Sequence, residues 1–294
     1  MNDANAEWNK CVADQKKMKN FQTGVQRFSI QKNADQMAKN LTEGNVERVN
    51  DQLARLNFPP GSSVLDIGAG PGTLAVPLAA RGCAVTVVEP SVPMQNAMED
   101  YKKIKGVDDD IFVIPKIWED IHSDEIGQFD YVVSSFAMAV PNLKDALLKM
   151  NRVCKKDVHI FWFLVPPPWD KAAEALWKNL HGEEFYRRPL ANLIWDALYE
   201  LGIYADLEVL PLKDVHYYET FEEAAAEYAD RLSAVEEKQI RIVENYLKEN
   251  MTETAKGWRL SGEGLYAHIW WESNHSSFFQ IGKEPERIYK NKDQ

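Results

Sequence analysis

The pattern of hydrophobic and polar residues changes near residue 60. Before it, residues 1–56 are mostly polar, and Val49, Leu53 and Leu56 recur at the spacing of one helical face. Two prolines and a glycine within residues 58–61 end this helical pattern. We therefore predict an N-terminal helical cap over residues 1–56, followed by a domain of a different type.

From residue 63 onward, short apolar runs alternate with amphipathic stretches. One such stretch is helical, because Leu143, Leu147, Met150 and Cys154 lie on one face of a helix. The apolar runs have the length and composition of buried parallel strands. They cover residues 64–67, 84–88, 111–114, 131–134 and 159–165. Alternating strands and helices are typical of an α/β protein whose parallel sheet is covered by helices on both faces.

The last third of the chain is less regular. Residues 203–210 alternate as a half-exposed strand, and residues 265–272 are the last strand candidate. Between them, residues 212–256 contain neither Gly nor Pro, so we expect most of this segment to be helical. The predicted core therefore covers 57–275, with a helical insertion around 212–256, and a C-terminal tail covers 276–294.

The strongest chemical signal follows the first predicted strand, where the chain reads DIGAGPG. Gly68, Gly70 and Gly72 come two residues apart, and Asp66 precedes them. Ligands of parallel sheets bind past the carboxyl ends of the strands. Glycine at that place lets the backbone turn sharply and approach a ligand without a Cβ. The spacing therefore predicts a ligand-binding turn over residues 68–72.

Two details separate this turn from a dinucleotide fingerprint. The pattern GxGxxG would need a glycine at position 73, which is Thr73. The second predicted strand ends in Glu89, 23 residues after Asp66. A carboxylate there can accept hydrogen bonds from both ribose hydroxyls of an adenosine.

The runs VLDIGAGPGT and VTVVEP resemble those of class I S-adenosylmethionine (SAM)-dependent methyltransferases, in particular the small-molecule type called methyltransferase type 11. The resemblance spans residues 57–165. It implies SAM as the cofactor and a Rossmann-like sheet of seven strands. It also implies the strand order 3-2-1-4-5-7-6, with the last strand antiparallel.

The resemblance also implies which residues contact SAM. Asp66 and the glycine turn would lie against its methionine part, and Glu89 would bind its ribose. The adenine side would be lined by Pro90, Ser91 and Met94. Many relatives carry an Asp on the adenine amino group where this chain has Ile117, so that contact is left open. Trp118 either contacts the adenine, helped by its backbone N–H or by Glu119, or is an ordinary packed residue. The full predicted set is Asp66, Gly68, Ala69, Gly70, Gly72, Thr73, Glu89, Pro90, Ser91, Met94, Trp118, Glu119, Ser134 and Ser135.

The acceptor side is less defined. Phe136 and Met138 would face the transferred methyl group, and Trp169 and Tyr217 are the other candidates for acceptor contacts, with core packing as the alternative. Methyl transfer from a sulfonium depends mainly on positioning and on exclusion of water. If a base is needed, His216 is the candidate. No metal site is predicted, because no two histidines have ligand spacing.

Composition limits the partners. The formal net charge of −11 opposes binding to the phosphates of nucleic acids. No apolar run reaches the roughly 20 residues that a bilayer span needs. The N-terminus lacks the pattern of a secretory signal. We therefore expect a cytoplasmic enzyme with a small-molecule acceptor, with no indication of its oligomeric state.

Three other functions stay open at this point. A non-catalytic SAM-binding protein would keep the same cofactor signature. An aminopropyl transferase that uses decarboxylated SAM would need an acidic cluster after the fourth strand, where this chain reads SSFAMAV. A nicotinamide-dependent oxidoreductase is disfavoured by Thr73.

Overall fold

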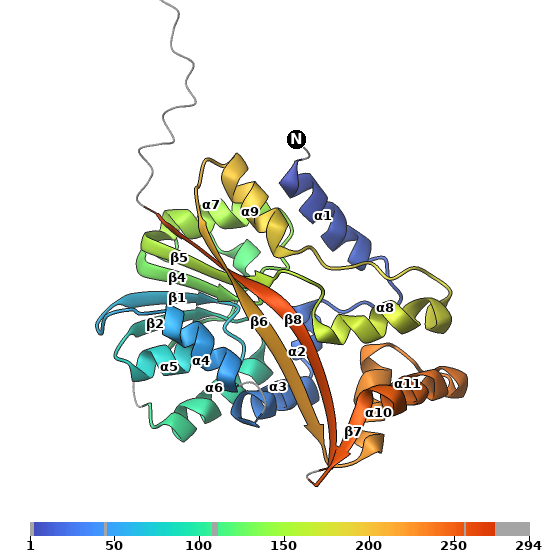
Figure 1. The fold of residues 1–294 in the computed structure, drawn as a ribbon. Coiled ribbons are helices and arrows are strands. Elements are labelled where there is room, and N and C mark those ends of the chain that lie inside the picture. Colours follow the sequence, from blue (N-terminus) through green and yellow to red (C-terminus); the bar gives the residue numbers. More distant parts are fainter. Residues whose placement is uncertain (1–2, 44–45, 108–110, 256, 274–294) are drawn as a thin grey trace, which may run out of the picture.

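The computed structural model describes residues 3–43, 46–107, 111–255 and 257–273 (Figure 1). Within them, four helices precede the first strand. They are α1 (Ala4–Gln15), α2 (Gly24–Phe28), α3 (Gln31–Glu43) and α4 (Val46–Arg55). Among all described helices, none combines the length and the apolar character needed to cross a bilayer.

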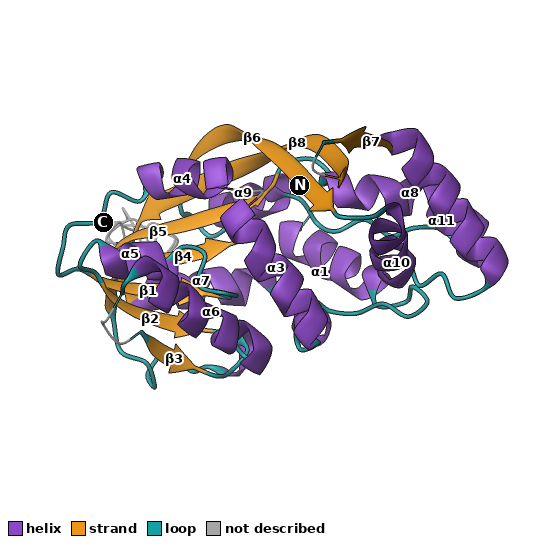
Figure 2. Cartoon of the chain, turned by 90° about the horizontal axis from the view of Figure 1, so that it is seen from below, coloured by secondary structure: helices purple, strands orange, loops and turns teal. Residues whose placement is uncertain are grey.

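The centre of the fold is a mixed sheet covered by helices on both sides (Figures 1 and 2). Its parallel strands are β1 (Ser63–Ile67), β2 (Ala84–Val88), β3 (Phe112–Ile114), β4 (Phe129–Ser135) and β5 (Cys154–Phe163). The helices between them are α5 (Ala75–Ala80), α6 (Val92–Lys105), the short η1 (Trp118–Asp120) and α7 (Leu143–Val153). Two helices, α8 (Pro168–His181) and α9 (Ala191–Glu200), follow β5.

The described part of the sheet is completed by β6 (Asp206–Tyr218), β7 (Met251–Thr254) and β8 (Gly257–Glu272). The strand order is β3-β2-β1-β4-β5-β8-β6, and β8 is antiparallel to β5. This confirms the predicted Rossmann-like α/β fold, with β8 in the place of the predicted seventh strand. The described residues hold eight strands rather than seven, because β7 pairs with β8 beside the main path.

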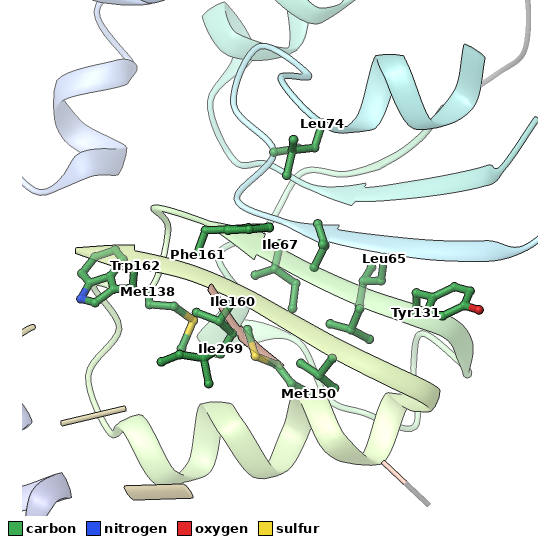
Figure 3. Packing of buried hydrophobic residues seen from close by; sticks show 14 of the residues in the cluster. Leu65, Ile67, Leu74, Tyr131, Met138, Met150, Ile160, Phe161, Trp162 and Ile269 are labelled. Carbon is green, nitrogen blue, oxygen red and sulfur yellow. The ribbon is translucent and has the colours of Figure 1, made fainter. Parts of the chain in front are cut away.

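The core is built from strands that are apolar on both faces. Leu65, Val132 and Ile160 are completely buried, as expected for parallel strands that lie between two layers of helices. Figure 3 shows Ile160 with Met138, Met150 and Ile269 on the side of the sheet that α7 covers.

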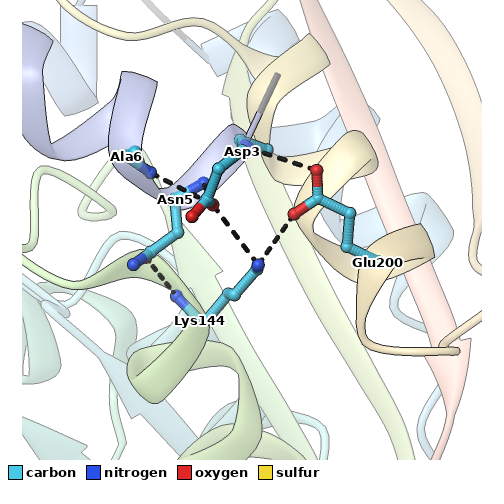
Figure 4. Close-up of polar contacts among 6 residues, drawn as sticks. Asp3, Asn5, Ala6, Lys144 and Glu200 are labelled. Carbon is cyan, nitrogen blue, oxygen red and sulfur yellow. Dashed lines mark hydrogen bonds and ion pairs between the residues drawn. The ribbon is translucent and has the colours of Figure 1, made fainter. Parts of the chain in front are cut away.

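A polar contact attaches the N-terminal helix to this layer. Asp3 caps α1 by accepting the backbone N–H groups of Asn5 and Ala6. The Lys144 ammonium of α7 lies 3.4 Å from the Asp3 carboxylate and 2.8 Å from the Glu200 carboxylate of α9 (Figure 4). The first described helix is therefore joined to α7 and α9.

The segment 212–256 is mostly helical, as expected, but strands form its two ends. Residues 212–218 continue β6, and residues 251–254 form β7, so the helices are limited to α10 (Phe221–Arg231) and α11 (Glu237–Asn250). The first end is a strand because every second residue along it is buried, and Leu212, Asp214 and His216 all point inward. The predicted tail at 276–294 lies outside the described residues.

A long two-stranded arm extends the sheet. The pairing of β5 with β8 ends at Phe163 and Tyr266, whereas β6 and β8 stay paired for eight more residues on each strand. We call residues 211–218 and 258–265 the arm. Because β8 is antiparallel to β5, the arm continues past the carboxyl end of β5, where ligands of such sheets bind. Its far end lies against α10, α11 and β7 (Figure 1).

Candidate functional site

The glycine turn after β1 has the conformation that its sequence predicts. Gly68, Gly70 and Gly72 all have positive φ, at 71°, 57° and 79°. An added Cβ at Gly72 would lie 2.7 Å from Met98 and 2.8 Å from Val76, so this glycine packs the turn against α6 and α5. At Gly70 the nearest atom would be the Met37 methyl of α3, at 3.9 Å. Space for a ligand backbone is therefore left beside Gly70.

Glu89 is fixed to this turn from the end of β2. Its carboxylate is 7% exposed and accepts the backbone N–H of Gly70 at 2.9 Å and that of Ser91 at 2.8 Å. Burial raises the pKa of Glu89, and the two hydrogen bonds oppose that rise. Each carboxylate oxygen keeps a second lone pair. The carboxylate can therefore still accept a hydrogen bond from each of the two hydroxyls of a ribose.

Asp66 is a second buried carboxylate beside Glu89. It lies at 2% exposure in β1, and burial together with the charge of Glu89 raises the pKa of Asp66 to about 7. A cation placed between the turn and these residues would offset this cost. The site therefore favours a ligand that carries both hydroxyls and a positive charge.

Helix α2 is bonded to the start of α6, next to Glu89. The Ser91 hydroxyl caps α6 by accepting the Met94 N–H at 3.3 Å and donates to the Phe28 carbonyl of α2 at 2.7 Å. Met94 is 1% exposed, and Pro90 is half-buried. Of the remaining predicted turn residues, Ala69 is buried and Thr73 is half-buried. The structure thus brings the predicted residues of the turn and of the β2 end together.

The loop after β3 is held by a lysine that the sequence analysis did not single out. The Lys149 ammonium, on α7, donates to the carbonyls of Trp118 and Ile121, the latter at 2.8 Å, and lies 4.5 Å from the centre of the Trp118 ring. Trp118 is 3% exposed within the core, and Glu119 is exposed. A lysine among the apolar positions of a helix is the signal that identifies such a contact in a sequence.

The end of β4 passes below the turn. The Ser134 hydroxyl donates to the Ile67 carbonyl at 3.2 Å, which ties β4 to β1. The Ser135 hydroxyl accepts the side-chain amide of Gln52, a completely buried residue of α4, at 3.1 Å. Phe136 then adopts a φ of +55°, which is uncommon for a residue with a side chain.

The Phe136 ring belongs to an aromatic cluster. It stacks on Phe163 with a centroid distance of 4.6 Å and meets the edge of Tyr266 at 5.5 Å. Trp169 joins through Phe163, at 5.4 Å. Among the other predicted acceptor residues, Met138 is completely buried in the core (Figure 3). Tyr217 is 38% exposed, because successive strand residues face opposite sides and its neighbours His216 and Tyr218 point inward.

Two polar residues on the inner face of the arm form a pair. The His216 Nε2 atom lies 3.0 Å from each oxygen of the Asp214 carboxylate. Both residues are less than 9% exposed. Asp214 therefore holds the His216 ring in one orientation.

Arg48 of α4 is a further residue that the sequence analysis missed. Its guanidinium carbon lies 5.2 Å from the centre of the Phe136 ring. Burial lowers the pKa of Arg48, and the negative charge of Asp214 opposes this shift. An arginine one turn before Gln52, beside the apolar stripe of α4, was the available signal.

Comparisons with known proteins agree with this architecture. A family model described as a methyltransferase domain matches residues 37–197. A protein of Haemophilus influenzae described as uncharacterized is 29% identical over 244 residues, which cover 82% of this chain and 87% of that protein.

Solved structures share the fold at low sequence identity. A candidate methyltransferase of Bacillus halodurans C-125 has a TM-score of 0.52 and 15% identity, and the match covers 76% of this chain and 98% of that protein. Coclaurine N-methyltransferase, solved with N-methylheliamine and S-adenosylhomocysteine (SAH), has a TM-score of 0.50 and 14% identity, covering 92% of this chain and 88% of its own.

Proposed function

Because the chain belongs to the methyltransferase domain family, we propose that it transfers a methyl group from SAM to a small-molecule acceptor. The observation that supports this most directly is the buried Glu89 carboxylate, held 2.9 Å from the Gly70 backbone N–H. Glu89 lies at the position proposed for the ribose of SAM, and Gly70 lies at the position proposed for its methionine part. A dinucleotide site would instead have a glycine where this chain has Thr73.

The residues around the turn divide the binding of SAM between them. Glu89 accepts the ribose hydroxyls, and Asp66 faces the cationic amino-acid part, beside the space at Gly70. SAM, when bound, supplies a methyl group on a positively charged sulfur, and the leaving group of the transfer is the neutral thioether SAH. No acid is needed for this leaving group, so the protein contributes by orienting the acceptor and excluding water.

The aromatic cluster and the arm provide the acceptor side. Phe136, Phe163 and Tyr266 form an aromatic cluster at the end of β4, in which Phe136 is the partly exposed ring. His216, oriented by Asp214, is the base we propose for an acceptor that must lose a proton. Asp214 would stabilise the protonated ring, since its carboxylate contacts the nitrogen of the imidazole.

Two measurements test the proposal. Calorimetry should show that SAM and SAH bind, and methyl-labelled SAM incubated with the protein and a metabolite extract should give a labelled small molecule. Binding without transfer would instead indicate a non-catalytic SAM-binding protein. Binding that needs decarboxylated SAM would indicate an aminopropyl transferase. If neither nucleoside binds, the SAM site proposed at Glu89 and the glycine turn is wrong.

A further inference from the structure

Three residues from distant parts of the chain meet at the end of β4, beside the proposed SAM site. The Arg48 guanidinium lies over the Phe136 ring at 5.2 Å, and Tyr266 meets the same ring edge-on at 5.5 Å. Arg48 and Tyr266 are also close enough to influence each other's charge. We call Arg48, Phe136 and Tyr266 the Arg48 cluster.

Two donors of this cluster lack partners. The Arg48 Nε atom and the Tyr266 hydroxyl are both buried, and neither has a hydrogen-bond partner among the described residues. Tyr266 is completely buried, so water does not replace the missing partner from bulk solvent. Buried polar groups are normally paired, and each exception needs an explanation.

The neighbouring Asp214 does not supply the missing partner. Both of its carboxylate oxygens lie 3.0 Å from His216 Nε2, and within the described ranges no hydrogen bond or ion pair joins it to Arg48. A buried N–H donor without a partner, such as Arg48 Nε–H, is costly to the fold. A ligand group that pairs with Arg48 explains why the chain keeps it there.

We propose that the acceptor carries a carboxylate, which binds the Arg48 guanidinium and the Tyr266 hydroxyl beside the Phe136 ring. This inference rests on the proposed methyltransferase function. Two unpaired donors that flank one ring match in number the two oxygens of a carboxylate. The partly exposed Phe136 ring, stacked on the buried Phe163, provides an apolar contact for the rest of the molecule. The net charge of −11, together with the nearby Asp214, disfavours a doubly charged phosphate.

A pair of variants on one helix tests whether Arg48 is kept for a ligand. Arg48→Met should not lower the melting temperature of the ligand-free protein, because it removes a buried N–H donor that has no partner among the described residues. Arg55→Met is the matched control, two turns later on α4. Its guanidinium binds both oxygens of Glu208, at 2.6 and 2.7 Å, so the control should melt at a lower temperature. A fall for Arg48→Met as large as that of the control would overturn the proposal.

Binding of two simple probes tests the chemistry. With SAH present, the protein should bind benzoate about tenfold or more tightly than benzamide, as expected for hydrogen bonds to a charged group. Arg48→Met should remove this preference, and Tyr266→Phe should reduce it. Equal binding of the two probes, no binding of benzoate, or a preference that survives in Arg48→Met would each count against a carboxylate subsite.

The charge of the natural product gives a third reading. Label from methyl-labelled SAM should appear in compounds that an anion-exchange resin retains, or in a neutral methyl ester whose hydrolysis releases a retained acid. A cationic product, or a neutral one that hydrolysis does not convert, would overturn the proposal while leaving the methyltransferase function intact. Failure of SAM to bind would instead contradict that function, and the probe and stability measurements would still decide the role of Arg48.

Discussion

The carboxylate of Glu89 accepts the backbone N–H of Gly70 at 2.9 Å, so the end of the second strand is bonded directly to the turn that follows the first. This hydrogen bond fixes the positions of Gly70 and Glu89 relative to each other before a ligand binds. A ligand consequently does not have to bring the end of β2 and the glycine turn together.

Replacement of this carboxylate is expected to affect the ligand more than the fold. Glu89→Gln should weaken SAM binding about 10- to 100-fold, since hydrogen bonds to a charged group contribute about 1.5–3 kcal/mol. Calorimetry measures the change. Glu99→Gln, at an exposed position of the following helix α6, is the control and should bind SAM like the unmodified protein. Equal affinities of the two variants would show that Glu89 does not contact the nucleoside.

The glycines of the turn should differ in their effect on stability. Gly72→Ala combines a φ of +79° with contacts of 2.7 and 2.8 Å to Met98 and Val76, and should lower the free energy of unfolding by about 2–4 kcal/mol. Gly70→Ala meets no atom closer than 3.9 Å, and its φ of +57° alone should cost about 1–2 kcal/mol. Urea denaturation distinguishes them. A larger loss in Gly70→Ala would contradict the packing described for the turn.

Stability should depend on pH through Asp66. The pKa of Asp66 is about 7 in the folded protein, against 3.8 for the ordinary side chain. Between these values the unfolded chain loses this proton while the folded protein keeps it, so the contribution of Asp66 to stability falls as the pH rises from about 4 to 7. Asp66→Asn removes this fall. Its advantage in free energy of unfolding over the unmodified protein should therefore grow across this range and stay constant above it.

The same group predicts a pH dependence of SAM binding. A cation beside Asp66 favours the ionised carboxylate, so the affinity should rise between pH 6 and pH 8. Calorimetry at several pH values, with Asp66→Asn as the comparison, isolates this effect from titration of the ligand. Parallel pH profiles for the two proteins would exclude a contact between Asp66 and the amino-acid part of SAM.

Two lysines of α7 should contribute unequally to stability. Lys149→Met leaves the buried carbonyls of the Trp118 loop without their donor, and should cost about 2–4 kcal/mol. Lys144 forms ion pairs with Asp3 and Glu200 (Figure 4), but it is 30% exposed, so Lys144→Met should cost less than about 1 kcal/mol. Denaturation in urea compares the two. A smaller effect at Lys149 would contradict its role in holding the loop.

The parallel half of the fold was predictable from sequence for a local reason. Residues 64–67 are all buried and residues 84–88 are mostly buried, so both runs are largely apolar and their ends are marked by glycine or by an acidic residue. The glycine turn and Glu89 follow these strand ends directly. Their approach to each other needs only the register of two neighbouring strands, in which Ile67 pairs with Val88.

The proposed acceptor side was not predictable in the same way. Asp214 and His216 are polar residues at inward positions of β6, so the period of two that marks a strand is hidden when only apolar residues are counted. Arg48 and Tyr266 come from a helix near one end of the chain and a strand near the other. Their meeting at Phe136 depends on how α4 lies against β8, which no local pattern encodes.

Because the two strands of the arm are paired without interruption, the length of the arm can change while the pairing is kept. Adding a single residue to each strand would lengthen the arm by about 3.4 Å and turn every later side chain to the opposite face. Adding two would restore the inward set about 7 Å farther out. Changes of even length in β6 and β8 can thus set how far the arm extends without any change in the parallel half of the sheet.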